Sequence, residues 1–596
     1  MPSHPQPEDE VFALIRHGAE LHARGLITQA ESVYRAALRL DPACFDALHL
    51  LGLACHQQAR HAEAADYIGR AIVVDPAQPV AHSNLGLALA ALKRPAEAVA
   101  SFEHSLQLRP GDAQTLLSLG ISQLAAGLAG KALSSFEHAM LIVPDNPALL
   151  CNRGNALLAL KRHEEALASY DCAIALKADF PEALNNRGNT LRDLTRLEDA
   201  LASFEGALAL RPGYTGALNN RGITLRDLNR QAEALASYDH ALALDPEYAD
   251  AHCNRGNVLQ DLRRYPEALA SYEGALKSNP EHAESHWNES LCRLLMGDFG
   301  RGWQKYEWRW KTEQAASIRA FAQPLWLGRE DVAGKTVLLH AEQGFGDTLQ
   351  FCRYAKLVAA LGAEVVLEVQ PPLKRLLSGL EGVKEIRARG EALPAFDMHC
   401  PLLSLPLVFN TRLETIPSPR AYLLSDPARV ERWRKILGIR SRPRIGVVWS
   451  GSGGLRNDPG RSLLLTEMTG LVSGAGQFVC LQKEIRPEER DILRKRGDIL
   501  AFSEELLDFA DTAALVDLMD IVISVDTAVA HLAGALGKKA WILLPHAPTW
   551  RWLLDRADCP WYPSARLFRA PEIGNWGGLI AQVRVALESE IQPAVS

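Results

Sequence analysis

The chain has 596 residues, 47% hydrophobic and 23% charged, a composition typical of folded globular proteins rather than disordered ones. At roughly 150 residues per domain, this length predicts about four domains. The net charge of −7 argues against a general nucleic-acid binder. The ten cysteines form no CxxC pair, which favours a reducing compartment without structural zinc. No secretory leader or membrane-spanning segment is visible, so we expect a cytoplasmic protein.

A 34-residue period runs through the first half of the chain. One series is glycine, and a second is mostly aromatic: Gly18, Gly52, Gly86, Gly120, Gly154, Gly188, Gly222 and Gly256, with Tyr34, Ile68, Phe102, Phe136, Tyr170, Phe204, Tyr238 and Tyr272. Small residues from Ala37 to Ala275 and prolines from Pro42 to Pro280 keep the same register. A helix–turn–helix unit of this length and pattern resembles the tetratricopeptide repeat (TPR). We expect the glycine to let neighbouring helices approach closely, and the proline to stop the second helix.

The repeat array is expected to occupy residues 11–316, as eight full repeats and a capping repeat that begins near residue 283. Trp303, Trp308 and Trp310 end this capping repeat, and we expect them to cover its open face and to dock the array onto the following region. Because no single repeat can bury its apolar face alone, the stack should form a superhelix with a concave groove. Residues 317–335 are read as a linker.

A further series consists of asparagine, two residues before the glycine position. Its members are Asn84, Asn152, Asn186, Asn220, Asn254 and Asn288. Asparagine is a mediocre helix former, so helix propensity does not favour its repetition there. In the TPR pattern this position faces the groove, where amides could hold a peptide backbone. The alternative is that these amides bond within the array. Either way, we expect a protein or peptide partner.

The second half alternates strand and helix patterns. We expect a first α/β half at 336–425, with strands at 336–341 and 364–369, and a second half at 426–596, with strands at 444–450, 478–481, 521–525 and 539–544. Helices are expected from just after Asp347 to about Leu361, and at 372–380, 426–437 and 528–536. The predicted fold is therefore an α-solenoid followed by two Rossmann-type α/β domains. Ligands of such sheets bind at the carboxyl ends of the strands.

Asp347 follows the first of these strands, in the segment Gly344-Phe345-Gly346-Asp347. A carboxylate in this place could act as a general base toward a hydroxyl group. Alternatively, Asp347 caps the next helix. A dinucleotide site is a further alternative, because Glu368 could bind a ribose, although Leu349 stands where the third glycine of that motif would be.

The segment from Asp526 to His531 follows a second buried strand. We expect Asp526 and Thr527 to cap a helix that starts at Ala528, whose first-turn amides form an anion site suited to phosphate. Thr527 and His531 are four residues apart and share a helix face. His531 could contact the phosphate or ribose of a donor, or it could be a satisfied core residue.

Further candidates for the donor site follow other strands of the second half. They are Ser450, Gly451, Arg461, Gln482 and Lys483. Arginine binds phosphate in a bidentate manner, so Arg461 could neutralise a leaving nucleotide; its alternative is a solvated loop. The sequence contains no Asp-x-Asp motif, so we expect neither a metal nor another cofactor.

The second half resembles the heptosyltransferase-like glycosyltransferases of the GT-B type. Gly346-Asp347 and the run from Asp526 through His531 to Leu536 carry this resemblance. Together with the repeats, the chain is similar to bacterial TPR-bearing glycosyltransferases, some of which modify flagellin with nonulosonic acids. The resemblance implies metal-free, inverting transfer from a nucleotide sugar, with Asp347 as base and 526–531 as the donor-phosphate segment. The first α/β half is shorter than in heptosyltransferases, at about 90–100 residues, so elements that bind an acceptor are expected to be missing from it. The repeats are therefore expected to bring a protein Ser/Thr acceptor. The alternatives are a non-catalytic TPR scaffold and a transferase acting on lipopolysaccharide or another glycan.

Overall fold

The computed structural model describes residues 7–312, 319–451, 462–472, 476–572 and 574–591. The chain divides into two compact units, Met1–Pro246 and Glu247–Ser596. The boundary between them falls inside the repeat array, between its seventh and eighth helical hairpins. The second unit therefore contains the last repeats together with both α/β regions.

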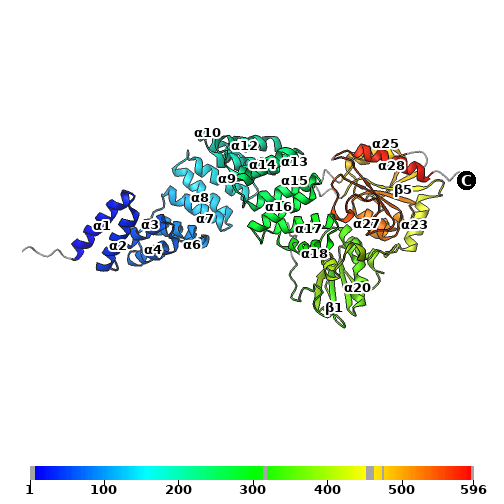
Figure 1. Ribbon diagram of the computed structural model, residues 1–596, viewed down its shortest axis with the longest axis horizontal. Coiled ribbons are helices and arrows are strands. Elements are labelled where there is room, and N and C mark those ends of the chain that lie inside the picture. The colour runs from blue at the N-terminus through cyan, green and yellow to red at the C-terminus, as the bar shows by residue number, and fades with distance from the viewer. Residues whose placement is uncertain (1–6, 313–318, 452–461, 473–475, 573, 592–596) are drawn as a thin grey trace, which may run out of the picture. The chain divides into compact units, whose positions relative to one another are not determined.

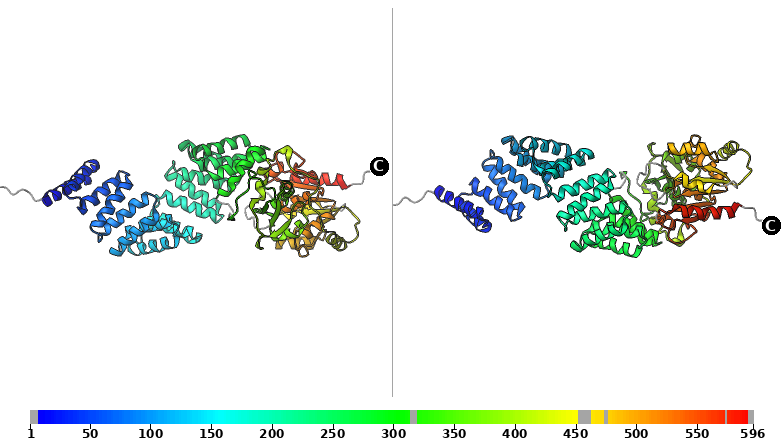
Figure 2. Two further views of the ribbon diagram at one scale, coloured as in Figure 1. Left: turned by 90° about the horizontal axis from the view of Figure 1, so that it is seen from below. Right: turned by 90° about the horizontal axis from the view of Figure 1, so that it is seen from above.

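The first unit consists of seven consecutive helical hairpins, which Figures 1 and 2 show in blue to teal. Their helices are α1 (Pro7–Ala23), α2 (Ile27–Leu40), α3 (Phe45–Gln57), α4 (His61–Val74), α5 (Pro79–Ala91), α6 (Pro95–Leu108), α7 (Ala113–Ala125), α8 (Ala129–Ile142), α9 (Pro147–Ala159), α10 (His163–Leu176), α11 (Pro181–Asp193), α12 (Leu197–Leu210), α13 (Thr215–Asp227) and α14 (Gln231–Leu244). Each helix from α1 to α13 contacts the helix that follows it in the chain. This arrangement confirms the predicted TPR solenoid.

The glycine and aromatic series meet inside each hairpin. A Cβ atom added to Gly154 would lie 2.6 Å from Cε1 of Tyr170, and the same clash arises at every member of the glycine series. Tyr170 is fully buried, so the ring fills the space that the missing side chain leaves. The predicted role of the glycine, close approach of the two helices, is confirmed.

Two further hairpins open the second unit. They consist of α15 (Ala249–Asp261), α16 (Tyr265–Ser278), α17 (Ala283–Leu295) and α18 (Phe299–Tyr306), followed by the 3₁₀ turn η1 (Glu307–Lys311). The described part of the chain thus has eighteen solenoid helices, as eight repeats and a shorter ninth. Within the predicted linker, the Trp326 backbone N–H donates to the carbonyl of His399 at 2.8 Å, so this segment lies along the first sheet.

The first sheet has four parallel strands in the order β3-β2-β1-β4. Its elements are β1 (Thr336–His340), α19 (Phe345–Phe351), η2 (Cys352–Tyr354), α20 (Ala355–Ala360), β2 (Glu364–Val369), η3 (Pro371–Leu373), α21 (Lys374–Leu377), β3 (Glu385–Ala388), β4 (Met398–Pro401), η4 (Leu402–Ser404), α22 (Leu405–Val408) and η5 (Leu413–Thr415). The helix predicted to run to Leu361 is interrupted at η2, where the buried Arg353 side chain binds backbone carbonyls.

The second sheet has six parallel strands in the order β10-β9-β8-β5-β6-β7. Its elements, yellow to red in Figure 1, are α23 (Pro427–Leu437), β5 (Arg444–Val448), α24 (Leu465–Met468), η6 (Thr469–Leu471), β6 (Gln477–Cys480), α25 (Pro487–Arg496), β7 (Ile499–Ala501), α26 (Phe509–Asp517), β8 (Ile521–Val525), α27 (Ala528–Ala535), β9 (Ala540–Leu544), η7 (Trp550–Trp552), β10 (Ala565–Arg569) and α28 (Trp576–Ile591). Counted from β5, the spatial order is 3-2-1-4-5-6, that of a doubly wound nucleotide-binding sheet. The prediction of parallel α/β architecture is confirmed.

All ten cysteines are free thiols. Among the described helices, none is both long and apolar enough to cross a bilayer.

Candidate functional site

Strands β5 and β8 are neighbours at the point where the strand order of the second sheet reverses. Ligands of doubly wound sheets bind at this crevice, beyond the carboxyl ends of the strands. Ser450 and Gly451 follow β5, and Asp526 and Thr527 follow β8. Four predicted donor-site residues thus lie at the switch point, and of these Gly451 is exposed.

Helix α27 starts at the switch point without a side-chain cap. Its N-cap residue is Thr527, whose hydroxyl group instead pairs with the hydroxyl of Ser524 at 2.9 Å. Asp526 accepts a hydrogen bond from the Thr549 hydroxyl at 3.0 Å. Thr527 thus occupies the predicted N-cap position, but the expected side-chain cap is not formed by Thr527, and Asp526 bonds elsewhere. Thr527 and Ala528 are half-buried, and the first turn retains the partial positive charge of a helix N-terminus.

His531 is buried within α27, at 4% exposure. Its Nδ1 lies 2.9 Å from the Tyr562 hydroxyl, and Nε2 lies 3.8 Å from a carboxylate oxygen of Asp526. Burial lowers the pKa of His531 to about 4, and the positive charges of Arg551 and Arg353 contribute to the shift. The imidazole is neutral near pH 7, an arrangement that fits the core-residue alternative for His531.

Helices α19 and α27 meet at Gly346. A Cβ atom on Gly346 would lie 2.7 Å from Cδ2 of His531 and 3.6 Å from the Cα atom of Ala528. Gly346 thus serves close packing of α19 on α27 rather than the approach of a pyrophosphate to its own backbone. In addition, Glu368 is buried and paired with Arg319. Both observations disfavour the dinucleotide alternative.

Asp347 lies in the first turn of α19, next to this contact. One carboxylate oxygen, Oδ2, accepts a hydrogen bond from the Gly344 backbone N–H at 3.0 Å. The N-cap residue itself is Gly344, so the alternative that Asp347 occupies the N-cap position is wrong, although its carboxylate does bind the helix start. The other oxygen forms an ion pair with Arg551. Asp347 and Arg551 each retain 14% side-chain exposure.

Arg551 was not predicted from the sequence. It lies in η7, in the loop that follows β9, and its guanidinium group is 4.5 Å from the ring centre of Trp550. Burial lowers the pKa of Arg551, but the negative charges of Asp347 and Asp526 outweigh burial, and the net shift is upward. The only local signal is an arginine between two tryptophans after a buried strand.

Gln482 joins the ends of β5 and β6. Its Oε1 accepts hydrogen bonds from the backbone N–H groups of Trp449 at 2.6 Å and Ser450 at 3.0 Å, and its Nε2 donates to the Ser450 hydroxyl at 3.2 Å. Lys483 donates to the carbonyl of Leu507 at 2.6 Å. These side chains hold the strand ends that frame the crevice. Arg461 lies outside the described residues.

The last repeat packs against this site. Trp303 on α18 meets Trp550 edge-on, with ring centres 5.2 Å apart, and also contacts Phe351 of α19. Trp308 instead stacks on His286, and Trp310 faces Arg309. The predicted docking role is thus confirmed for Trp303, while Trp308 and Trp310 stabilise their own repeat.

A buried charge network joins η1 to the loop that precedes α19. Arg309 donates two hydrogen bonds to the Glu342 carboxylate, at 2.9 and 3.0 Å, and further bonds to Glu307 and Ser404. Arg309 and Glu342 are 5% and 6% exposed. Glu342 also accepts from the backbone N–H of Leu403, so the network fixes the loop that leads to Asp347.

The six asparagines of the repeat series are all half-buried. Their described bonds run from the amide nitrogen of Asn84 to His49, of Asn152 to the Ala148 carbonyl, of Asn186 to Asn155, of Asn220 to Asn185 and of Asn288 to Cys253. Four of these five bonds reach the preceding repeat. These five amides therefore bond within the array, as the alternative expectation had it. Asn254 occupies the equivalent half-buried position.

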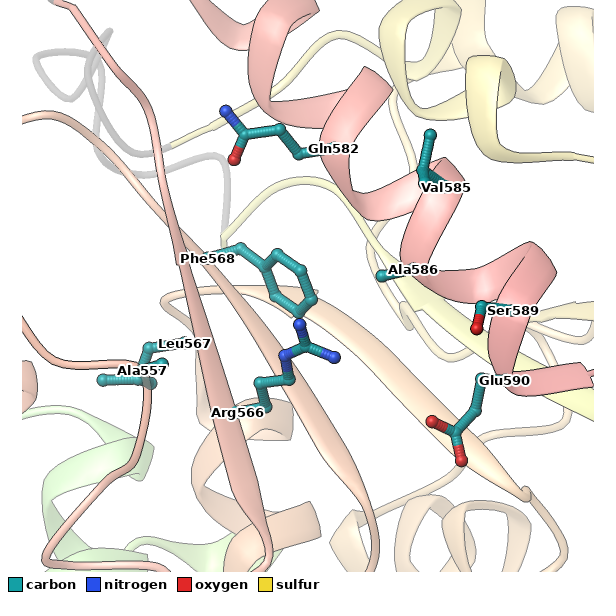
Figure 3. Close-up of a pocket in the computed structure, with 9 residues that line it drawn as sticks. All are labelled: Ala557, Arg566, Leu567, Phe568, Gln582, Val585, Ala586, Ser589 and Glu590. Atoms are coloured by element: carbon teal, nitrogen blue, oxygen red, sulfur yellow. The ribbon is translucent and has the colours of Figure 1, made fainter.

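A shallow pocket of about 490 Å³ lies at the edge of the second sheet, between β10 and α28 (Figure 3). Arg566 and Phe568 line it from the strand, and Val585 and Glu590 line it from the helix. None of the predicted site residues lies there. Across the described ranges, no group of three or more His, Cys, Asp or Glu residues is arranged to hold a metal.

Comparisons with known proteins identify the repeats. Family profiles described as TPR or tetratricopeptide repeat match residues 16–81, 79–112, 154–194, 181–214, 224–263 and 253–302. Protein FlbA of Caulobacter vibrioides is 28% identical over 323 residues, which cover 49% of this chain and 53% of FlbA. The chain thus spans about half the length of this relative.

Two solved structures also match part of the chain. One is the APC/C hetero-tetramer Cut9–Hcn1, with 17% identity, a TM-score of 0.36, and coverage of 47% of this chain and 55% of the other. The other is YrrB, described as a TPR protein with an unusual peptide-binding site, with 24% identity, a TM-score of 0.26, and coverage of 31% and 96%. The chain is a TPR-containing protein, whose repeats precede two parallel α/β sheets.

Proposed function

We propose that the protein is a glycosyltransferase that moves a sugar from a nucleotide-sugar donor to a hydroxyl group of a protein acceptor. The observation that carries the proposal is the contact of Gly346 with His531, which brings Asp347 beside the uncapped start of α27. A candidate base and a candidate phosphate site from two different sheets are thereby neighbours. The heptosyltransferase-like motifs support the same assignment, including a GT-B fold.

In the proposed reaction, Asp347 accepts the proton of the acceptor hydroxyl while the oxygen attacks the anomeric carbon. The bond from that carbon to the donor phosphate breaks, and its electron pair leaves on the phosphate oxygen, with inversion at carbon. The first-turn amides of α27, at a dipole charge of about +0.5, stabilise the negative charge of the leaving group. Gly451 follows the neighbouring strand β5 and is exposed, so we expect the nucleotide on this side.

Nucleotide binding and turnover test this proposal separately. A thermal-shift panel of CMP-, UDP-, GDP- and ADP-sugars should raise the melting temperature of the wild-type protein for at least one donor, because a ligand that binds the native state stabilises it. Asp347→Asn should lower turnover by about 10²- to 10⁴-fold without loss of nucleotide binding. Undiminished turnover would remove Asp347 from the mechanism.

The repeats are proposed to recruit the acceptor, a polypeptide. Flagellin as acceptor and a nonulosonic acid as sugar follow from the family resemblance alone. Asn220→Ala should raise KM for a protein acceptor and leave donor hydrolysis unchanged. Equal kinetics on protein and on free glycan acceptors would instead favour a transferase of glycans or lipopolysaccharide, with the repeats serving assembly.

A second candidate is a scaffold without catalytic activity. It is favoured by one observation: both carboxylate oxygens of Asp347 already have partners, Gly344 and Arg551. A scaffold predicts that no donor in the panel stabilises the protein, while partner binding by the repeats persists.

A further inference from the structure

The ion pair between Asp347 and Arg551 joins the two α/β regions. Asp347 begins α19 after the first sheet, whereas Arg551 follows β9 of the second sheet. Oδ2 accepts from the Gly344 N–H and Oδ1 is paired with Arg551, so both oxygens of the carboxylate are engaged and the Arg551 charge opposes proton uptake. A ligand that competes for the guanidinium group removes this opposing charge and favours Asp347 as a base.

Arg551 has a donor to offer to such a competitor. Its Nε–H is buried and has no hydrogen-bond partner in the part of the chain that the structure describes. An unsatisfied buried donor costs about 1–3 kcal/mol, so a ligand that accepts from it gains free energy. A phosphate group suits the guanidinium fork, because it can accept from Nε and a terminal nitrogen together.

The surroundings of Arg551 favour an anion. Arg353 is buried nearby, and its four described hydrogen bonds go to neutral acceptors: the carbonyls of Gln350, Pro417 and Trp561 and the hydroxyl of Tyr422. The positive charges of Arg353 and Arg551 both lower the pKa of His531. Two carboxylates, Asp347 and Asp526, face Arg551. The positive charge of Arg551 becomes available to a phosphate only when the ion pair with Asp347 breaks.

We propose that Arg551 binds the phosphate of the nucleotide donor, and that this binding displaces Asp347 and frees its carboxylate to act as base. The inference rests on the proposed function and assigns it a further binding residue. When no donor is bound, Arg551 is therefore paired with Asp347. The acceptor proton moves to Oδ1 of Asp347 only when the leaving phosphate has taken the guanidinium group, so an empty donor site holds no free base.

Competition makes a prediction that a purely structural ion pair does not. Asp347→Asn removes the rival carboxylate, so it should tighten the binding of the nucleotide product (CMP, UDP, GDP or ADP) by about fivefold or more. Arg551→Gln should weaken that binding by about tenfold or more. In the double variant that combines both substitutions, Asp347→Asn should not raise the nucleotide affinity above that of Arg551→Gln alone. Isothermal titration calorimetry on the full chain measures all three.

Two controls keep the result interpretable. Arg556→Gln breaks an exposed ion pair with Asp558 a few residues away and should leave nucleotide binding unchanged. Arg551→Lys keeps the charge and should lose less affinity than Arg551→Gln, with the tryptophan emission spectrum reporting an intact fold. Wild-type-like or weaker binding by Asp347→Asn overturns the competition alone. Absence of binding by the wild type for every nucleotide overturns the proposed function as well.

Discussion

Charged residues are used differently in the early repeats and in the last one. In the first unit, Arg94 pairs with Glu97 at a helix start, and both side chains are about half exposed, at 50% and 56%. Arg309, which follows the last repeat helix, pairs with Glu342 of the first α/β region, at 5% and 6% exposure. Exposed pairs contribute little to stability, whereas a buried charge that loses its partner is costly.

The comparison teaches that one repeat geometry can serve two purposes. The early hairpins rely on shape, with a glycine against an aromatic ring in each except the second, where Ile68 takes its place. The last hairpin keeps the repeat register at Tyr306 but adds Trp303 and Arg309, which contact the α/β region. Its contacts explain why the second compact unit begins before α15. The following predictions test this contrast.

The largest effect is expected from Arg309→Met. The substitution leaves Glu307 and Glu342 buried without their cation, which should destabilise the second unit by about 3–5 kcal/mol. All twelve tryptophans lie at or after Trp287, so tryptophan fluorescence during urea unfolding reports this unit alone. Arg94→Met is the matched control and should leave the fluorescence midpoint unchanged. Equal midpoints for the two variants would contradict the contrast.

Acid should destabilise the second unit through His531. Its pKa in the folded state, about 4, lies below the unfolded value of about 6.5, so the unfolded chain binds more protons between these values. The contribution of neutral His531 to the free energy of unfolding is fully present above pH 6.5. It is lost as the pH falls toward 4, by about 3 kcal/mol in total. His340, whose burial lowers its pKa to about 3, acts in the same direction.

The variant His531→Gln isolates this contribution. Urea midpoints from tryptophan fluorescence should fall less steeply between pH 6.5 and 4 in the variant than in the wild type. Parallel pH profiles would show that His531 is not the group responsible.

A smaller effect is expected in the first unit, from a pair of glycines in one hairpin. Gly52→Ala places a Cβ atom 2.5 Å from Cγ1 of Ile68 and 3.2 Å from the Ala64 carbonyl oxygen, and should cost about 1–3 kcal/mol. Gly69→Ala meets no atom within 4 Å and should stabilise its helix by about 0.5–1 kcal/mol. Far-UV circular dichroism follows the helices, and opposite shifts are expected; shifts of the same sign would contradict the packing role.

The sequence predicts best those features that repeat or lie in continuous apolar runs. The glycine–aromatic contacts follow from a register kept over eight units, and β2 and β8 have the predicted bounds because both are rich in Val, Ile and Leu. Strand β4, Met398–Pro401, is short and ends in proline, so no periodicity announces it. The pairing of Asp347 with Arg551 spans 204 residues and depends on how two sheets meet, which no local pattern encodes.

One regularity of the repeats escaped the sequence pattern because its residues differ. The turn inside each hairpin has a residue with φ between 57° and 83°, and the positions are Gly25, Ala59, Lys93, Gly127, Lys161, Thr195, Asn229, Arg263 and Gly297. They follow the 34-residue spacing, yet only three are glycine. The left-handed conformation is therefore imposed by the two helices rather than by the residue.

The smallest expected effect comes from this turn. Ala59→Gly relieves a left-handed conformation that costs roughly 1–2 kcal/mol for a side chain with a Cβ atom. Glycine in turn loses more backbone entropy on folding, by about 0.5–1 kcal/mol, so the net gain should be below about 1 kcal/mol. Gly127→Ala is the reverse change at the equivalent position and should destabilise by a similar amount. Far-UV circular dichroism during urea unfolding measures both; a loss of stability in Ala59→Gly would mean that the turn in this repeat carries no strain to relieve.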